Sequence, residues 1–348
     1  MWAASLSNHN PLAVIFGCSG PDLTDVERDF FAATNPLGFI LFQRNCDTPD
    51  QVRALVADLR SAVGRADAPI LIDQEGGRVA RLKPPHWPTF PAAKVYADVY
   101  AKDSDAGLLA ARLGGQLIAA ELAALGLTVD CAPVLDVPQP GADLIIGDRA
   151  FGADVPTIIP LAKAFMAGLA AGGVDAVIKH IPGHGRALVD SHLDLPIVEA
   201  TRADLETVDF PPFKALNTAP WAMTAHVIYT CLDDQNPATT SAVVIDQVIR
   251  DELGFQGLLL SDDLSMKALS GTLKERAEAC LAAGCDIALH CNGQMDEMVL
   301  VAQGAKVMTP DALARYKGIE QRRLDARQNF AVTLARKQFD DVLGKTAG

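Results

Sequence analysis

Three histidines gather in one short stretch of the chain, KHIPGHGRALVDSHLDLP, which runs from Lys179 to Pro196. The third of them, His192, follows Asp190 by two residues. A carboxylate beside an imidazole fixes the tautomer and the orientation of the ring, which is what a general acid/base histidine needs. The tripeptide is not specific by itself, because Asp-x-His combinations are common.

A metal site is a competing interpretation of the same stretch, with ligands from His180, His184, Asp190 and His192. His-x3-His spacing is typical of zinc ligands when a helix places both imidazoles on one face. Pro182 and the glycines on either side of His184 prevent a helix over this span. We therefore expect no metal and no cofactor. In the third interpretation, each histidine makes only a structural hydrogen bond.

Two adjacent aspartates follow a serine at the end of an apolar run, GLLLSDDLSM. A carboxylate held on a rigid strand end can act as a nucleophile. Alternatively, Ser261, Asp262 or Asp263 caps the helix that follows. The sequence favours capping for Asp263 and leaves both interpretations open for Asp262.

Two further motifs contain charged side chains of both signs. LIDQEGGRVARL contains Asp73 and Arg81, and IIGDRAFG contains Arg149. These charges could pair with one another. They could also hydrogen-bond a polyhydroxylated ligand, for which carboxylate and guanidinium groups are well suited.

Eight short apolar runs precede such polar residues along the chain. They do not alternate with polar residues, which is typical of parallel strands buried on both faces. Because the polar residues cluster at the carboxyl ends of the runs, we predict a (β/α)8 barrel, whose active site lies at that face. A doubly wound sheet is the alternative that periodicity leaves open. The runs are Leu12–Gly17, Gly38–Phe42, Pro69–Asp73, Thr128–Ala132, Ala176–His180, Ala222–His226, Gly257–Asp262 and Asp286–His290.

Helical patterns fall between these runs. Thr24-x-x-Glu27 and Thr48-Pro49-Asp50-Gln51 are predicted to be capping boxes. Further helices are predicted over residues 106–125 and 158–170, and closing helices over 310–330. With no linker or repeat, the pattern indicates one domain.

Composition excludes several classes of protein. The 348 residues include 43 acidic and 30 basic side chains, a formal net charge of −13. Without a basic field to attract phosphates, we expect no nucleic-acid partner. The apolar runs are too short for a membrane span, and the N-terminus lacks the basic segment and apolar core of a signal peptide. We expect a small-molecule substrate, no membrane association and a monomer.

Cysteine usage indicates a compartment. The chain has seven cysteines, an odd number, and no Cys-x-x-Cys pair. Five of them lie in apolar stretches and are predicted to be small buried hydrophobes: Cys18, Cys131, Cys231, Cys280 and Cys285. This usage is typical of a reducing environment and predicts a cytoplasmic location.

Taken in order, the motifs resemble those of glycoside hydrolase family 3. Within it they resemble exo-acting β-N-acetylglucosaminidases of bacterial cell-wall recycling. The resemblance runs from GFILFQRN through IDQEGGRVARL, IGDRAFG, KHIPGHG, DSHLDLP and SDDLSM to AGCDIALHCN. KHIPGHG followed by DSH is its most specific element, because the β-glucosidase branch takes its acid/base from a second domain. The resemblance implies a single catalytic barrel domain over residues 1–348.

The resemblance also implies roles for individual residues. Asp262 matches the nucleophile, His192 the general acid/base and Asp190 its partner. The departure from the family pattern is the segment 186–189, Arg-Ala-Leu-Val. The residues that match positions holding the terminal sugar are Asp73, Arg81, Arg149, Lys179 and His180.

The implied reaction is retaining hydrolysis of terminal β-linked N-acetylglucosamine through a covalent glycosyl-enzyme. The implied substrates are muropeptide fragments, including those that end in 1,6-anhydro-N-acetylmuramic acid. Two other functions stay open. Phosphorolysis is compatible with the same scaffold, because an imidazole tolerates phosphate near the intermediate, and a non-catalytic sugar-binding protein would need no turnover at all.

Overall fold

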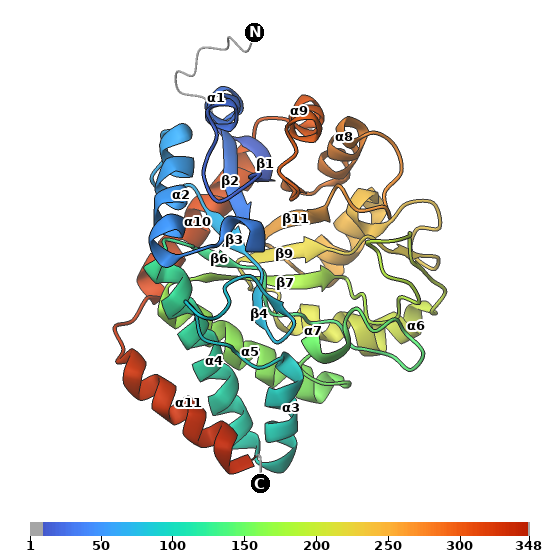
Figure 1. The fold of residues 1–348 in the computed structure, drawn as a ribbon. Coiled ribbons are helices and arrows are strands. Elements are labelled where there is room, and N and C mark those ends of the chain that lie inside the picture. The colour runs from blue at the N-terminus through green and yellow to red at the C-terminus, as the bar shows by residue number, and fades with distance from the viewer. Residues whose placement is uncertain (1–9, 347–348) are drawn as a thin grey trace.

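A computed structural model describes residues 10–346, and its centre is a closed barrel of parallel strands (Figure 1). Each strand corresponds to one predicted apolar run. The barrel closes because β1 pairs with β2 on one side and with β12 on the other. The predicted (β/α)8 barrel is therefore confirmed, and the doubly wound sheet is excluded. In chain order the barrel strands are β1 (Leu12–Gly17), β2 (Pro36–Leu41), β3 (Ile70–Ile72), β6 (Val129–Asp130), β7 (Asp175–Ile181), β9 (Trp221–Thr224), β11 (Leu258–Asp263) and β12 (Ile287–His290).

Two short strand pairs lie outside the barrel. The hairpin of β4 (Gln74–Gly76) and β5 (Val79–Ala80) is antiparallel and follows β3 directly. The pair of β8 (Ile197–Val198) and β10 (Ile228–Tyr229) is parallel. Both pairs occur in loops that follow the carboxyl ends of barrel strands.

The expectation about a signal peptide concerns residues 1–9 above all, which lie outside the described residues.

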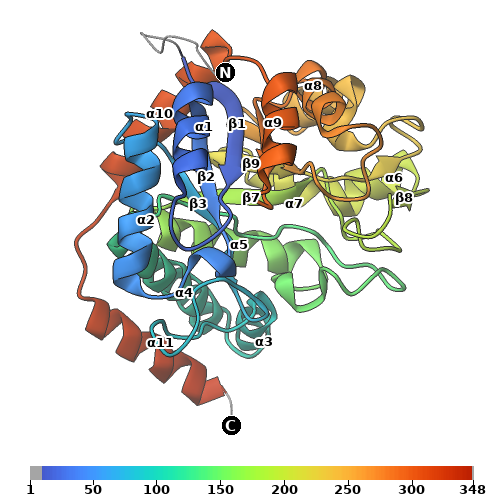
Figure 2. The ribbon, with the colours of Figure 1, turned by 45° about the horizontal axis from the view of Figure 1, so that its top comes forward.

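Helices surround the barrel (Figures 1 and 2). The predicted helices over 106–125 and 158–170 correspond to α4 and α5. The predicted closing segment 310–330 corresponds to α10 and the residues directly after it, and a further helix, α11, follows. The α-helices are α1 (Asp25–Thr34), α2 (Pro49–Ala62), α3 (Ala93–Lys102), α4 (Ser104–Ala124), α5 (Val155–Gly172), α6 (Arg202–Asp204), α7 (Phe210–Ala215), α8 (Leu273–Ala283), α9 (Met295–Gly304), α10 (Pro310–Ala326) and α11 (Val332–Thr346). Shorter 3-10 segments are Gln43–Asn45, Gly147–Arg149 and Ala238–Thr240, and π-helical segments are Leu205–Asp209 and Val244–Glu252.

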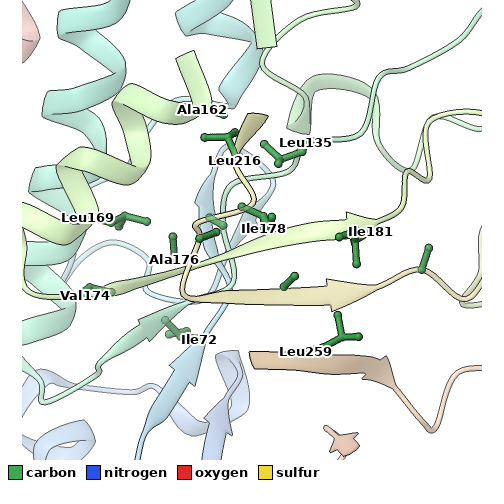
Figure 3. Close-up of a cluster of buried hydrophobic side chains, with 14 of the residues drawn as sticks. Ile72, Leu135, Ala162, Leu169, Val174, Ala176, Ile178, Ile181, Leu216 and Leu259 are labelled. Atoms are coloured by element: carbon green, nitrogen blue, oxygen red, sulfur yellow. The ribbon is translucent and has the colours of Figure 1, made fainter. Parts of the chain in front are cut away.

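The core has an inner and an outer layer because alternate residues of a strand point to opposite sides of the barrel wall. In β7, Val177 belongs to the cluster inside the barrel together with Trp221. Its neighbour Ile178 belongs to the outer cluster with Leu169 of α5 (Figure 3). This layering explains why the strands are apolar without alternation.

Helices α4 and α5 approach each other closely because glycines line their contact. A Cβ on Gly115 would lie 2.2 Å from the carbonyl oxygen of Phe165, and one on Gly168 would lie 2.1 Å from that of Arg112. By length and composition alone, both helices are long and apolar enough to cross a membrane. Both contribute buried residues to the core around the barrel, and this packing accounts for their apolar composition.

One of the two predicted capping boxes is complete. Thr24 Oγ1 accepts from the Glu27 amide at 3.2 Å, and the Glu27 carboxylate accepts from the Thr24 amide at 3.0 Å. At α2, Thr48 Oγ1 accepts from the Gln51 amide at 3.3 Å, but Gln51 Oε1 accepts from the amide of Asp47. The second box is half formed, because the Gln51 side-chain amide donates to the carbonyls of Pro21, in the loop after β1, and Asn45, in the loop before α2.

The cysteine prediction fails at one position. Four of the five cysteines predicted to be buried are buried, but Cys231 is exposed. It lies in the turn after β10, where its apolar neighbours in sequence do not cover it. All seven cysteines are free.

Candidate active site

The carboxyl ends of the barrel strands open on a cavity of about 250 Å³. The eighth residue predicted for the site, Asp190, does not line it and reaches it through a contact with His192. The other seven do line it, and they come from five loops or strand ends: Asp73, Arg81, Arg149, Lys179, His180, His192 and Asp262.

Asp73 and Lys179 form a buried ion pair in this cavity. Lys179 Nζ lies 2.9 Å from Asp73 Oδ1, and Arg81 Nη2 lies 3.0 Å from Asp73 Oδ2. Burial alone would raise the pKa of Asp73, but Lys179 and Arg81 outweigh it and hold the pKa well below its usual range. Asp73 is therefore a carboxylate whose orientation two cations fix.

Glu75 is a second buried carboxylate, and the sequence did not single it out. Its two oxygens accept from Arg149 at 2.8 Å each, and Oε1 lies 2.6 Å from Lys179 Nζ. Burial would raise its pKa, but Arg149 and Lys179 lower the pKa of Glu75 to about 2. Glu75 thus fixes the direction of two side chains that were predicted to hold the sugar.

Asp136 is a third carboxylate, fully buried and in contact with the His180 ring. Its Oδ2 lies 2.7 Å from His180 Nδ1, and Oδ1 accepts the backbone amides of His180 at 3.1 Å and His184 at 2.6 Å. Burial would raise the pKa of Asp136, but His180 lowers it below the usual range. The ionised carboxylate favours the His180 tautomer with a proton on Nδ1, so that Nε2 is available to a ligand.

His184 connects the start of the following loop to its later part. Its Nε2 lies 3.2 Å from Ser191 Oγ, and both residues are buried. Burial, with the neighbouring His180, lowers the pKa of His184 to about 4. A neutral His184 therefore holds Ser191, the residue directly before His192, close to the start of the loop.

Asp262 lies near the end of β11 and presents an ionised carboxylate to the cavity. Its Oδ1 accepts from the Asp263 amide at 2.8 Å. Burial would raise its pKa, but His226 and His180 lower it. His226 is itself held by Thr239 Oγ1 at 2.7 Å. A carboxylate that is ionised and fixed in place has the properties of a nucleophile.

The alternative that Ser261, Asp262 or Asp263 caps the following helix is wrong. Helix α8 begins at Leu273 and is capped by Thr272. Asp263 instead has a local structural role, because its Oδ1 accepts the amides of Ser265 at 3.0 Å and Cys291 at 3.2 Å. The loop between strand and helix is longer than the sequence pattern suggested, so Thr272, and not Ser261, Asp262 or Asp263, caps α8.

The predicted pair of Asp190 and His192 is present on the loop after β7. His192 Nδ1 lies 2.7 Å from Asp190 Oδ1, which also accepts the His192 amide at 2.9 Å. Burial would slightly raise the pKa of Asp190, but hydrogen bonds from His192 lower it. The His192 side chain is 61% exposed and lines the cavity that holds Asp262. Its Nε2 is left for a ligand.

The three histidines between Lys179 and Pro196 do not share a common centre. His180 pairs with Asp136, His184 with Ser191, and His192 with Asp190. Over residues 10–346, no group of three or more histidine, cysteine or acidic side chains is arranged to hold a metal ion.

The sequence held a signal for one of the missed carboxylates. Glu75 lies two residues after Asp73 in an extended segment, so both side chains share one face. Asp136 follows β6 within PVLDVP, and no pattern there indicates a contact with His180 across the loop.

Comparison with known proteins gives the family. Residues 22–320 match the N-terminal domain of glycosyl hydrolase family 3. A β-hexosaminidase of Alkalilimnicola ehrlichii is 42% identical over 283 residues, 80% of each chain. A β-hexosaminidase of Aromatoleum aromaticum is 35% identical over 326 residues, 92% of this chain and 90% of that one.

A solved structure extends the comparison to three dimensions. NagZ of Neisseria gonorrhoeae, in complex with N-trifluoroacetyl-D-glucosamine, has a TM-score of 0.86 and 31% identity, covering 97% of this chain and all of that one (100%). The sequence matches extend across the strands that carry Asp73, Lys179 and Asp262, and the structural match covers the same barrel. The chain therefore belongs to glycosyl hydrolase family 3, as a β-N-acetylhexosaminidase.

Proposed function

We propose that the chain removes terminal β-linked N-acetylglucosamine from muropeptide fragments, including those that end in 1,6-anhydro-N-acetylmuramic acid. One observation carries the proposal: Asp262 and His192 line the same cavity as all five residues implied to hold the terminal sugar. The amino-sugar derivative bound to the Neisseria gonorrhoeae relative supports an N-acetylglucosamine site.

The proposed mechanism uses two steps with retention. Asp262 attacks the anomeric carbon, the glycosidic C–O bond breaks, and the leaving oxygen takes a proton from His192 Nε2. Water then attacks the anomeric carbon of the glycosyl-enzyme, gives its proton to His192, and displaces the Asp262 carboxylate. Asp190 holds the ring through Nδ1 in both steps.

The proposed sugar site is rigid before substrate arrives. Asp73 and Lys179 are tied to one another, and Glu75 ties Lys179 to Arg149. Charged groups fixed in this way need little reorganisation to hydrogen-bond sugar hydroxyls, which lowers the cost of binding. His180, oriented by Asp136, adds a further partner.

One set of assays tests the proposal. The purified chain is expected to hydrolyse an aryl β-N-acetylglucosaminide at least tenfold faster than the matching aryl β-glucoside, and to release N-acetylglucosamine from N-acetylglucosaminyl-1,6-anhydro-N-acetylmuramic acid. Release of the sugar 1-phosphate in phosphate buffer would assign phosphorolysis instead. If the chain binds the sugar but turns over none of these substrates, it is a non-catalytic sugar-binding protein.

We also propose that the enzyme acts as a monomer in the cytoplasm. The seven free cysteines are in the state that a reducing compartment maintains, which supports that location. Sedimentation of the purified chain and fractionation of cells test the two parts separately.

A further inference from the structure

A second cavity lies behind the loop that carries His192. It has a volume of about 400 Å³. One wall comes from the loop after β6, including Gln139 and Pro140, and another from Arg186 and Leu188 of the His192 loop. Backbone hydrogen bonds tie these walls together, because the Gln139 amide donates to the Gly185 carbonyl at 2.9 Å.

The remaining wall is β8 with the two residues after it. Strand β8 pairs with β10 through the carbonyls of Pro196 and Val198, which accept the amides of Ile228 and Thr230. Because successive residues point their backbone groups to opposite edges, the amide and carbonyl of Ile197 point away from β10. The sheet has only these two strands in the described residues, so that edge of β8 is unpaired.

The unpaired edge faces the cavity. Residues 197–200 all line it, whereas β10 contributes no lining residue. Of the lining residues, Leu188 is 67% exposed and Ile197 is 52% exposed. A strand edge flanked by exposed apolar side chains is the arrangement that binds an extended peptide as an added strand.

The second cavity shares two of its loops with the active-site cavity. Ile145 and Arg149 of the active-site cavity belong to the same loop as Gln139 and Pro140. His192, the proposed proton donor to the leaving group, belongs to the same loop as Arg186. The two loops that line the active-site cavity near His192 therefore also form two walls of the second cavity.

We propose that this second cavity binds a short extended peptide carried by the leaving group, added as a strand to the free edge of β8. The inference rests on the proposed muropeptide substrate. The edge at residues 197–200 spans roughly 10 Å, enough for about three extended residues. Arg186 donates from Nε to Asp209 and from Nη2 to the Asp204 carbonyl at 3.5 Å, which leaves Nη1 as a donor for a peptide carboxylate. Glu199 lines the same cavity and could accept an ammonium group.

The test compares two forms of one disaccharide, N-acetylglucosaminyl-1,6-anhydro-N-acetylmuramic acid with and without a tripeptide. We expect the wild-type kcat/KM to be about three- to tenfold higher for the peptide-bearing form, the range of one or two hydrogen bonds. Ile197→Pro removes the edge amide at a position where an edge strand tolerates proline, and should abolish that preference. Leu144→Pro, on the neighbouring loop at a residue that lines neither cavity, should retain it.

A second pair of variants tests the apolar wall without altering the backbone. Ile197→Asp should reduce the preference, whereas Leu144→Asp, which also places a charge at an exposed apolar position, should not. In a binding measurement on the wild-type chain, the Ile197 and Glu199 amide resonances should shift with the peptide-bearing product and not with N-acetylglucosamine.

The outcomes separate this inference from the proposed function. Equal kcat/KM values for the two disaccharides, with no amide shifts, would overturn the peptide site and leave the proposed function intact. Hydrolysis of the aryl glycoside with neither disaccharide cleaved would overturn the muropeptide substrate itself. A preference that survives in Ile197→Pro would show that the peptide binds elsewhere.

Discussion

The strand-end charges and the His192 loop hold their functional groups in opposite ways. Lys179 is 2% exposed and is fixed by two carboxylates of the segment after β3, Asp73 and Glu75. His192 is 61% exposed and has one partner, two residues away on its own loop. The strand ends are thus organised before any ligand arrives, whereas the proposed acid/base is positioned by local contacts that can move with the loop. The difference separates a rigid binding surface from a group that must act on both steps and then allow release.

The largest effect is expected from Asp262→Asn, which tests the rigid side of this comparison. The substitution keeps the shape and the hydrogen bond to the Asp263 amide but removes the nucleophilic charge. We expect the fold to be retained and kcat to fall on the order of 10⁴-fold or more. A slow fluorosugar should label Asp262 in the wild type. Wild-type turnover in the variant, or labelling of another residue, would show that the nucleophile is elsewhere.

Substitution of His192 tests the mobile side. His192→Ala should lower kcat/KM by about 10²–10³-fold for substrates with poor leaving groups and much less for activated aryl glycosides, because an activated leaving group needs little protonation. Asp190→Ala should give a milder form of the same pattern, since it orients the ring without transferring the proton. Equal losses for good and poor leaving groups would argue against the acid role.

Glu75→Gln asks whether the strand-end charges depend on one another. Removal of this carboxylate leaves Arg149 and Lys179 as neighbouring buried cations. We expect a loss of about 3 kcal/mol in the free energy of unfolding, measured by denaturant titration, together with a raised KM. Asp148→Asn is the matched control: it breaks the half-exposed pair with Arg78 and should cost less than about 1 kcal/mol. Similar losses in both variants would mean that the buried Glu75 ion pairs contribute no more to stability than the half-exposed pair of Asp148 and Arg78.

The pH dependence of stability follows from His184, which joins the two regions. Its pKa is lowered to about 4 in the folded chain, against about 6.5 when unfolded. Between these values the unfolded state binds more protons, so the free energy of unfolding falls as the pH drops from 6.5 toward 4. His184→Gln should flatten this slope in unfolding curves, whereas His86→Gln, at an exposed position, should not. An unchanged slope in the His184 variant would assign the acid sensitivity to other groups.

The smallest change is expected in hydrogen exchange, which compares the two regions directly. Amides of residues 184–194 should exchange at least tenfold faster than those of 175–181, because strand β7 is paired on both sides. Addition of N-acetylglucosamine should slow exchange in the loop and leave the strand unchanged. Equal protection in the free protein would contradict the contrast between a fixed strand and a mobile His192 loop.

The sequence by itself determined the barrel and most members of the site. Apolar runs without alternation predicted all eight barrel strands, and polar residues at their carboxyl ends predicted where the cavity lies, because both signals are local. The spacing of Asp190 and His192 likewise predicted a contact between near neighbours, and that contact is present.

Only the tertiary structure decided which distant charges meet. The placement of Glu75 between Arg149 and Lys179, and of Asp136 below His180, depends on how loops from different strands cross the barrel mouth. Loop length, which only the tertiary structure shows, rules out a helix cap at the end of β11. The surface position of Cys231 likewise explains its exposure. Local patterns predict the secondary structure of a residue's own segment. The pairing of buried charges depends on the closure of the barrel, which brings segments far apart in sequence to one rim.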